Sequence, residues 1–256
     1  MLFVSDLDGT VVYSRRTAHR ALTGLVGVEE YDGTMISWVT PDSWRLLARL
    51  SADGRFVPCT TRTWEQYRRI DLNGRPEWVI CCNGGAVYRS GRLDRDWDET
   101  IRASEPPELA AAAAETAGRA AAAGWTCRYV PPYFFYLVVP PGTPTTTLDQ
   151  IESRLPGGEG WHVHRHRDRK IYWISDAVSK GAAARYVAER TGSSVTLAAG
   201  DEELDLPLLS AARRALLPRH SSLVGTAAAA QAEVTAAEGV AAGEEILTRA
   251  VAELSG

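Results

Sequence analysis

Short apolar runs alternate with helix-like stretches through both ends of the chain. The apolar runs lie at 2–6, 55–62, 78–85 and 194–202, with a shorter one at 221–225. The helix-like stretches lie at 40–54, 64–74, 180–192 and 205–216. Strands that alternate with helices favour a parallel sheet with helices on both faces. The pattern therefore predicts an α/β fold with a doubly wound parallel sheet.

The middle of the chain has a different pattern, which predicts an inserted domain. Helix-like segments at 107–124 and 143–155 are each followed by two strand-like segments. Two such units form a small antiparallel sheet covered by two helices, an α+β layer. We therefore predict a main domain at 1–88 and 176–256 and an inserted α+β domain at 89–175. The Ala-rich C-terminal segment is expected to end in an amphipathic helix packed on the main domain.

Composition narrows the class of protein. The chain has 256 residues, of which 45% are hydrophobic and 23% charged, and a net charge of -4. This balance gives no electrostatic footprint for nucleic acid or for an anionic membrane. No apolar stretch approaches the ~20 residues that span a bilayer, and acids stand near the start where a signal peptide carries basic residues. We expect a cytoplasmic protein, a monomer or homodimer, with reduced cysteines.

The first apolar run ends in two aspartates separated by one residue. In an extended chain, residues two apart lie on the same side, so the carboxylates of Asp6 and Asp8 point into one small volume. They repel each other unless a cation lies between them. The alternative is a strand followed by an Asx-rich turn, in which Gly9 supplies a permissive backbone.

Polar residues also follow the other predicted strands. In a doubly wound sheet, ligands bind outside the carboxyl ends of the strands. The residues expected there are Asp6, Asp8, Thr10, Thr60, Thr61, Arg62, Asn83, Gly84, Gly85, Lys180, Gly200, Asp201 and Asp205. Carboxylates are hard oxygen ligands for Mg²⁺, while a lysine and hydroxyl groups suit phosphoryl oxygens. The set indicates a phosphate dianion bound through Mg²⁺, and the cation resolves the repulsion between the first two aspartates.

Four motifs in this set resemble those of the haloacid dehalogenase (HAD) superfamily. They are DLDGT at 6–10, the apolar strand that ends in Thr60, Lys180 within SKGAA, and GDEELD at 200–205. The insertion between the second and third motifs is similar to the caps of Cof-type, sucrose-phosphate and trehalose-phosphate phosphatases and of phosphomannomutases. Two positions depart from the family pattern, because Thr61 replaces a common glycine and Leu204 a common asparagine.

The resemblance implies a mechanism for these aspartates. Asp6 attacks phosphorus and forms an aspartyl-phosphate. Asp8 gives a proton to the leaving oxygen and later takes one from water. Mg²⁺ is expected between the Asp6 carboxylate, the Asp8 backbone carbonyl and Asp201. Asp205 is expected to support a coordinated water or Lys180.

The same resemblance implies a magnesium-dependent phosphatase for a small phosphorylated metabolite, with a sugar or polyol phosphate favoured. Thr60 is expected to hydrogen-bond the phosphoryl group, and Lys180 to neutralise its charge. Candidate substrate-binding residues are Gly9, Thr61, Arg62, Asn83, Gly84, Arg165 and Arg167. A phosphotransferase or mutase of the phosphomannomutase kind is the alternative. A non-catalytic binding protein on the same fold is a third reading.

Several of these residues also have plain structural interpretations. Lys180 could be a surface lysine at a helix start, although a cation is unfavourable there. Asp201 and Asp205 could be acids that match a helix dipole. Arg62 could equally lie on the surface, and Asn83 with its glycines could form only a turn.

The strand-like segment at 161–170 is the candidate specificity surface of the inserted domain. It contains Arg165 and Arg167, with His162, His164 and His166 at alternating positions. Discrimination between phosphate esters must come from surfaces that meet the rest of the substrate. The alternative for the arginines is a solvated sheet face. The histidines share one side of the strand, which mimics a metal site but lacks a further ligand.

Overall fold

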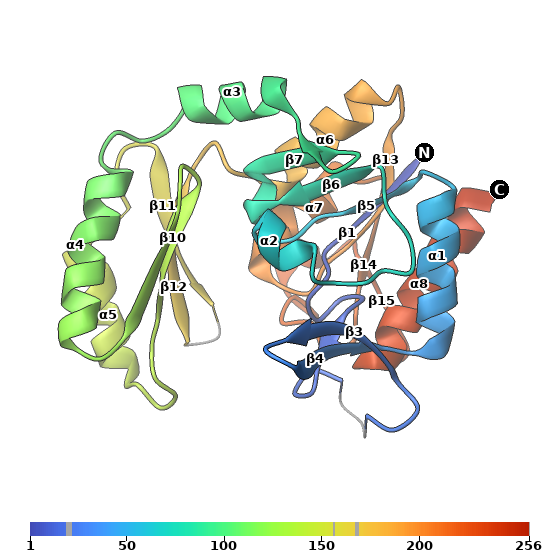
Figure 1. Cartoon of the computed structure of the whole chain (residues 1–256), viewed down its shortest axis with the longest axis horizontal. Coiled ribbons are helices and arrows are strands. Elements are labelled where there is room, and N and C mark those ends of the chain that lie inside the picture. The colour runs from blue at the N-terminus through green and yellow to red at the C-terminus, as the bar shows by residue number, and fades with distance from the viewer. Residues whose placement is uncertain (19–21, 156, 167–168, 256) are drawn as a thin grey trace. The chain divides into compact units, whose positions relative to one another are not determined.

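The computed structural model describes residues 1–255 except 19–21, 156 and 167–168. The chain divides into two compact units (Figure 1). The core unit comprises Met1–Asp94 and Ser179–Gly256, and the cap comprises Arg95–Val178. These boundaries lie six and three residues beyond those predicted at 88 and 175. The first boundary lies later than predicted because Tyr88 pairs with Leu93 in an antiparallel hairpin of the core unit, and the Asp94 backbone N–H donates to the Val87 carbonyl at 2.8 Å.

The core unit is built on a parallel sheet of five strands. They are β1 (Leu2–Ser5), β5 (Phe56–Pro58), β13 (Val195–Ala199), β14 (Arg214–Leu217) and β15 (Glu233–Val234). Their order is β15-β14-β13-β1-β5, and every pair is parallel. All residues of β1, β5 and β13 are buried, as expected of strands covered on both faces. The predicted doubly wound sheet is confirmed.

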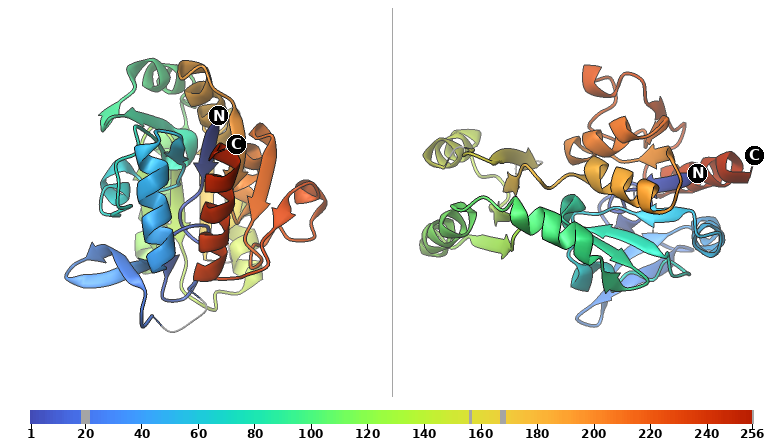
Figure 2. Two further views of the ribbon diagram at one scale, coloured as in Figure 1. Left: turned by 90° about the vertical axis from the view of Figure 1, so that its right-hand side faces the viewer. Right: turned by 90° about the horizontal axis from the view of Figure 1, so that it is seen from above.

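Helices cover both faces of this sheet. They are α1 (Pro41–Ala52), α6 (Lys180–Arg190), α7 (Leu206–Ala211) and α8 (Val240–Ser255). α1 packs against α8, and Figure 2 shows these two helices side by side in front of the sheet. α6 packs against α7. The C-terminal helix predicted from the Ala-rich segment is therefore α8, and it contacts β1 and β13.

Two small antiparallel sheets extend the core unit beyond the prediction. One joins β2 (Tyr13–Ser14), β3 (Val26–Tyr31) and β4 (Thr34–Val39) in the order β2-β4-β3. The other joins β6 (Trp78–Cys81), β7 (Ala86–Arg89) and β8 (Arg92–Leu93). β6 also continues the parallel sheet through a single bridge between Cys59 and Ile80. Short 3₁₀ segments lie at Cys82–Gly84, Glu203–Asp205 and Ala227–Ala229.

The helix predicted at 64–74 is much shorter in the structure. Only α2 (Trp64–Tyr67) forms, a single helical turn whose N-terminus is capped by the Thr63 side chain. The chain that follows pairs with β3 instead. Ile70 forms an antiparallel β-bridge with Glu29, and the backbone N–H of Asp71 donates to the Val28 carbonyl at 2.7 Å. Strand pairing competes with the helix here. The helix predicted at 205–216 is also too long, because it ends at Ala211 and Arg214–Leu217 form strand β14 instead. The apolar stretch at 221–225 lies in a turn.

The cap is the predicted antiparallel sheet with two covering helices. Its strands are β9 (Thr126–Val130), β10 (Phe134–Val138), β11 (Trp161–His166) and β12 (Lys170–Ser175), in the order β11-β12-β10-β9. The helices α4 (Leu109–Ala122) and α5 (Thr145–Arg154) lie on one face of this sheet (Figure 1). Phe135 and Trp173 stack there with ring centroids 4.8 Å apart. An unpredicted helix, α3 (Arg95–Ala103), precedes them.

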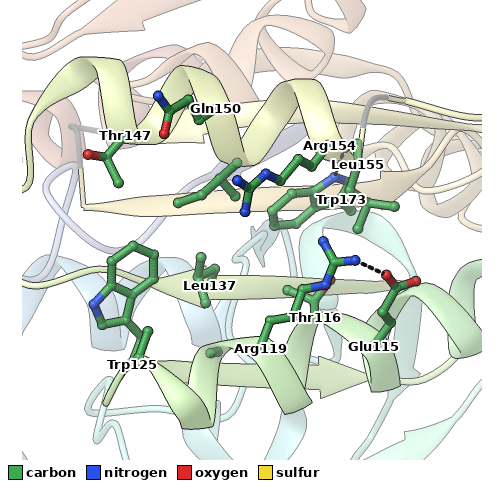
Figure 3. Close-up of a pocket in the computed structure, with 13 residues that line it drawn as sticks. Glu115, Thr116, Arg119, Trp125, Leu137, Thr147, Gln150, Arg154, Leu155 and Trp173 are labelled. Atoms are coloured by element: carbon green, nitrogen blue, oxygen red, sulfur yellow. Dashed lines mark hydrogen bonds and ion pairs between the residues drawn. The ribbon is translucent and has the colours of Figure 1, made fainter.

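The cap contains a pocket of about 210 Å³ between α4 and α5. Its walls include Trp125, Leu137 and Trp173. Figure 3 shows Arg119 and Arg154 entering it from the two helices. None of the residues predicted for catalysis lines this pocket. In the part of the chain that the structure describes, no helix is long and apolar enough to cross a membrane.

Candidate active site

The polar residues predicted from the strand ends meet at one end of the core sheet. Asp6 follows β1, Thr60 follows β5, and Asp201 follows β13. Ligand atoms of Asp6, Asp201 and Asp205 lie within 4.8 Å of one another, and all three residues are buried. Parallel strands place their carboxyl ends together, which is why these residues converge although they lie far apart in the sequence.

Lys180 is the buried cation of this cluster. Its side chain is 2% exposed, and its Nζ donates to Asp6 Oδ1 and to Asp205 Oδ1, both at 2.6 Å. It opens α6, whose N-cap is Ser179. Burial alone would lower the pKa of Lys180, but attraction to Asp205 and Asp6 outweighs burial and holds the pKa well above its ordinary value. The surface interpretation of Lys180 is therefore wrong.

The cluster holds more negative charge than one lysine balances. Burial raises the pKa of Asp6 to about 7, because attraction to Lys180 offsets only part of the burial effect and the carboxylates of Asp205 and Asp8 add to it. Such crowded, buried carboxylates are stabilised by a divalent cation, which prefers hard oxygen ligands. The residues present therefore fit a divalent metal ion, which Asp6 and Asp201 can ligate.

Asp205 organises the loop that carries Asp201. Its Oδ2 accepts hydrogen bonds from the backbone N–H groups of Asp201 at 2.9 Å and of Glu202 at 3.0 Å. Its Oδ1 accepts from Lys180. Both oxygens are thus engaged by protein donors, which agrees with the predicted supporting role toward Lys180. Direct metal binding by Asp205 stays a prediction. Nothing in the structure explains why Leu204 stands where the family pattern has asparagine.

Gly9 brings the first motif against Asp201. It has a left-handed backbone with a φ of +87°, and a β-carbon there would lie 2.7 Å from Asp201 Oδ2. Thr10 Oγ1 lies 3.2 Å from Asp201 Oδ1 and 3.4 Å from Asp6 Oδ2. Only glycine allows both the conformation and this approach. Gly9 therefore has a packing reason to be glycine, and its predicted substrate contact stays untested.

Two residues that the sequence analysis missed brace this turn. The hydroxyl of Tyr13 donates to the Thr10 carbonyl at 2.6 Å. His220 Nδ1 accepts from the backbone N–H of Gly239 at 3.0 Å, so its Nε2 carries the hydrogen and donates to the Gly9 carbonyl at 2.8 Å. A lone histidine beyond the last motif carries no local signal of this contact.

Arg62 pairs with two carboxylates, and its predicted substrate contact stays a prediction. Its Nε and Nη2 donate to the two carboxylate oxygens of Asp8 at 2.6 and 2.7 Å, a bidentate pair. Its Nη1 donates to Glu29 Oε1 at 2.7 Å. Arg62 is therefore mostly buried and paired with a predicted catalytic residue, which corrects the interpretation of Arg62 as a surface residue.

Thr60, Asn83 and Gly84 form the edge of the site next to Lys180. Thr60 Oγ1 accepts from the Arg62 backbone N–H at 3.1 Å, and the Asn83 N–H donates to the Thr60 carbonyl at 3.0 Å. Asn83 Oδ1 is buried without a hydrogen-bond partner among the described residues. Gly84 has a φ of +98°, and a β-carbon there would overlap the Ser179 carbonyl. Asn83 and Gly84 thus do more than form a turn, and the half-buried Thr61 lies in the same loop.

The predicted residues of the cap that the structure describes pair with acidic side chains of the cap itself. Arg165 donates to Glu152 Oε1 at 2.8 Å and to Asp149 Oδ1 at 2.7 Å, both on α5, the helix side of the cap sheet. Two acids thus hold the Arg165 guanidinium, and its predicted substrate contact stays a prediction. Arg167 lies outside the described residues. His162 pairs with Asp176 at 2.7 Å. Among the described residues, the histidines of β11 join no cluster with metal-ligand spacing.

No protein-family model and no curated protein sequence matches this chain. Solved structures do match its fold. Sucrose-phosphatase from Synechocystis sp. PCC6803, in complex with sucrose and phosphate, is similar over 100% of this chain and 98% of its own, with a TM-score of 0.67 and 17% identity. A haloacid dehalogenase-like hydrolase from B. subtilis covers 97% of this chain and 99% of its own, with a TM-score of 0.62 and 14% identity. A HAD subclass IIB sugar phosphatase covers 99% and 98%, with a TM-score of 0.61 and 11% identity.

These similarities extend over both units of the chain. At such identities the likeness establishes the fold and leaves the activity to be proposed. The resemblance predicted from the four motifs is confirmed at that level: the chain has the fold of the haloacid dehalogenase superfamily hydrolases, a Rossmann-like core with an inserted cap.

Proposed function

We propose that the protein is a magnesium-dependent phosphatase that hydrolyses a small phosphorylated metabolite through an aspartyl-phosphate. The observation that carries this proposal is the buried cluster in which Lys180 Nζ lies 2.6 Å from both Asp6 and Asp205, with Asp201 beside them. A cluster with this excess of carboxylate suits a metal ion and a phosphoryl dianion together. The shared fold with sugar phosphatases supports the same activity.

In the first half-reaction, Asp6 is the nucleophile. Its carboxylate oxygen attacks phosphorus while the bond from phosphorus to the leaving oxygen breaks, and the phosphoryl group passes to Asp6. Asp8 gives its proton to the leaving oxygen, which departs as an alcohol. Lys180 remains beside Asp6 and balances the charge of the incoming phosphoryl oxygens.

In the second half-reaction, water replaces the alcohol. Asp8, now a carboxylate, takes a proton from the water as its oxygen attacks phosphorus, and the bond from phosphorus to Asp6 breaks. Inorganic phosphate leaves and the Asp6 carboxylate is restored. We assign to Thr60 and Asn83 the role of neutral donors to phosphoryl oxygens, through the Thr60 hydroxyl and the Asn83 side-chain N–H, because the unpartnered Asn83 Oδ1 is an acceptor and cannot serve there.

Asp6, Asp201 and the Asp8 backbone carbonyl are the groups that would hold Mg²⁺. When bound, the ion neutralises charge on the phosphoryl oxygens and on Asp6. A sugar or polyol phosphate is the favoured substrate class, because the similar structures include a sucrose-phosphatase and a sugar phosphatase.

The test is a substrate screen with the purified full chain and Mg²⁺. Phosphorylated sugars and polyols are offered beside para-nitrophenyl phosphate, and inorganic phosphate is measured. We expect release of phosphate that falls to background in Asp6→Asn and persists in Asp42→Asn, a matched change of an exposed aspartate on α1. Transfer of the phosphoryl group between sugars without release of phosphate would favour the mutase alternative. Undiminished turnover in Asp6→Asn would refute the nucleophile.

A further inference from the structure

Glu29 is a buried carboxylate in the β3 strand. Its side chain is 0% exposed. The pairing of β3 with β4 shifts register on both sides of Glu29, between Gly27 and Glu29 and between Glu29 and Glu30. Such irregularities re-aim a side chain and occur often beside active sites. A carboxylate is costly to bury unless it is paired, so the role of Glu29 is inferred from the side chains that pair with it.

Three side chains donate hydrogen bonds to the Glu29 carboxylate. Its Oε2 accepts from Ser37 Oγ at 2.7 Å, across the hairpin. Its Oε1 accepts from Arg62 at 2.7 Å and from Arg69 at 3.2 Å. Burial alone would raise the pKa of Glu29, but these hydrogen bonds outweigh burial and keep the pKa below its ordinary value. Glu29 is therefore a fixed anion in the core unit.

Arg62 connects this fixed anion to the proposed acid and base. One edge of the guanidinium, at Nη1, is held by Glu29. The opposite edge, at Nε and Nη2, forms the bidentate pair with Asp8, whose side chain is 49% exposed. The guanidinium is planar and rigid, so fixing one edge sets the direction of the other. The half-exposed Asp8 side chain gains an anchored partner in this way.

We propose that Glu29 is a positioning residue, which acts through Arg62 to hold the ionised Asp8 carboxylate where it takes the proton from the attacking water in the second half-reaction. This inference rests on the proposed function. A general acid or base must lie within hydrogen-bond reach of the reacting oxygen, and a carboxylate free to rotate spends less time there. Buried ion pairs contribute little net stability, which makes orientation the better explanation for retaining one.

A purely structural role for Glu29 is the competing explanation. On that view Glu29 only ties the β3–β4 hairpin to the loop after β5. Arg69 offers a matched control, because it bonds Glu29 but has no bond to Asp8 among the described residues. Arg69→Met therefore weakens the tie while leaving the Arg62–Asp8 pair in place.

The experiment is a double-mutant cycle on turnover. kcat and KM are measured for the best substrate of the screen with Glu29→Gln, Asp8→Asn, the double variant and Arg69→Met. We expect Glu29→Gln to lower kcat ~10-fold, a part of the 10²–10⁴ that a general acid–base contributes, with KM changed less than ~3-fold. In the Asp8→Asn background the same change should leave kcat within ~2-fold, because residues that act through one another are not additive.

Two outcomes would overturn the inference. One is an equal loss of kcat from Glu29→Gln in both backgrounds, and the other is an equal loss from Arg69→Met. A crystal structure of Glu29→Gln supplies a readout that needs no activity: we expect the Arg62–Asp8 pair to be broken or displaced. An unchanged bidentate pair refutes the inference even where no ester is hydrolysed, whereas absence of turnover with a displaced pair refutes only the proposed function.

Discussion

Replacing Lys180 by methionine tests the electrostatic account of the site. Methionine keeps a similar length of side chain and removes the only cation that contacts both Asp6 and Asp205 in the described structure. Two buried carboxylates are then left without a counter-charge. Removing one partner of a buried ion pair costs about 3–5 kcal/mol, because the remaining charge is buried and unpaired.

This cost depends on pH in a defined direction. A carboxyl group whose pKa is raised in the folded state binds more protons there than in the unfolded state, so stability falls as pH rises from the unfolded pKa to the folded one. The pKa of Asp6 is already raised to about 7 with Lys180 present, and it rises further without the lysine. We expect the larger loss at about pH 8 and a loss smaller by about 1–2 kcal/mol at about pH 5, where Asp6 is protonated and carries no charge.

Urea unfolding in the presence of a chelator measures both values. The chain has one other lysine, Lys170, whose Nζ lies over the rings of Tyr136 and Tyr172 in the cap. Lys170→Met is the control, with an expected loss of about 0.5–1 kcal/mol that does not change with pH. Added Mg²⁺ should restore part of the stability of Lys180→Met. A loss for Lys180→Met that is the same at both pH values would refute the reasoning.

Further changes test separate parts of the site. Asp8→Asn should slow turnover by on the order of 10²-fold or more and leave Mg²⁺ affinity, measured by calorimetry, nearly unchanged, because its expected metal contact is the backbone carbonyl. Activity should require Mg²⁺ and be inhibited by Ca²⁺, whose coordination is looser, so full activity in a chelator would contradict the metal site. Gly84→Ala should lower the unfolding midpoint and weaken activity together, because the new methyl group overlaps the Ser179 carbonyl before Lys180. Arg165→Ala should leave KM unchanged for sugar and aryl phosphates alike, since Asp149 and Glu152 already hold its guanidinium, and a raised KM for one class alone would restore its predicted role.

Local patterns in the sequence determined the architecture of both units. β1 and β13 are short runs buried on both faces, and their composition alone separates them from the amphipathic helices between them. The two helix–strand–strand units of the cap are equally regular, and the insertion was predictable from the change of rhythm. Where long-range pairing opposes local preference, as at Ile70 and Asp71, the predicted helix was too long.

The acids and the lysine of the candidate site were also predictable, because each follows a strand or opens a helix at a place that the topology brings together. The partners of Arg62 could not be predicted in this way. It reaches Asp8 over 54 positions of the sequence and Glu29 over 33, and His220 reaches Gly9 over 211. Contacts of this kind have no period and no fixed spacing. Only the tertiary structure decides them, because a hydrogen bond depends on where two side chains lie in space and not on how many residues separate them.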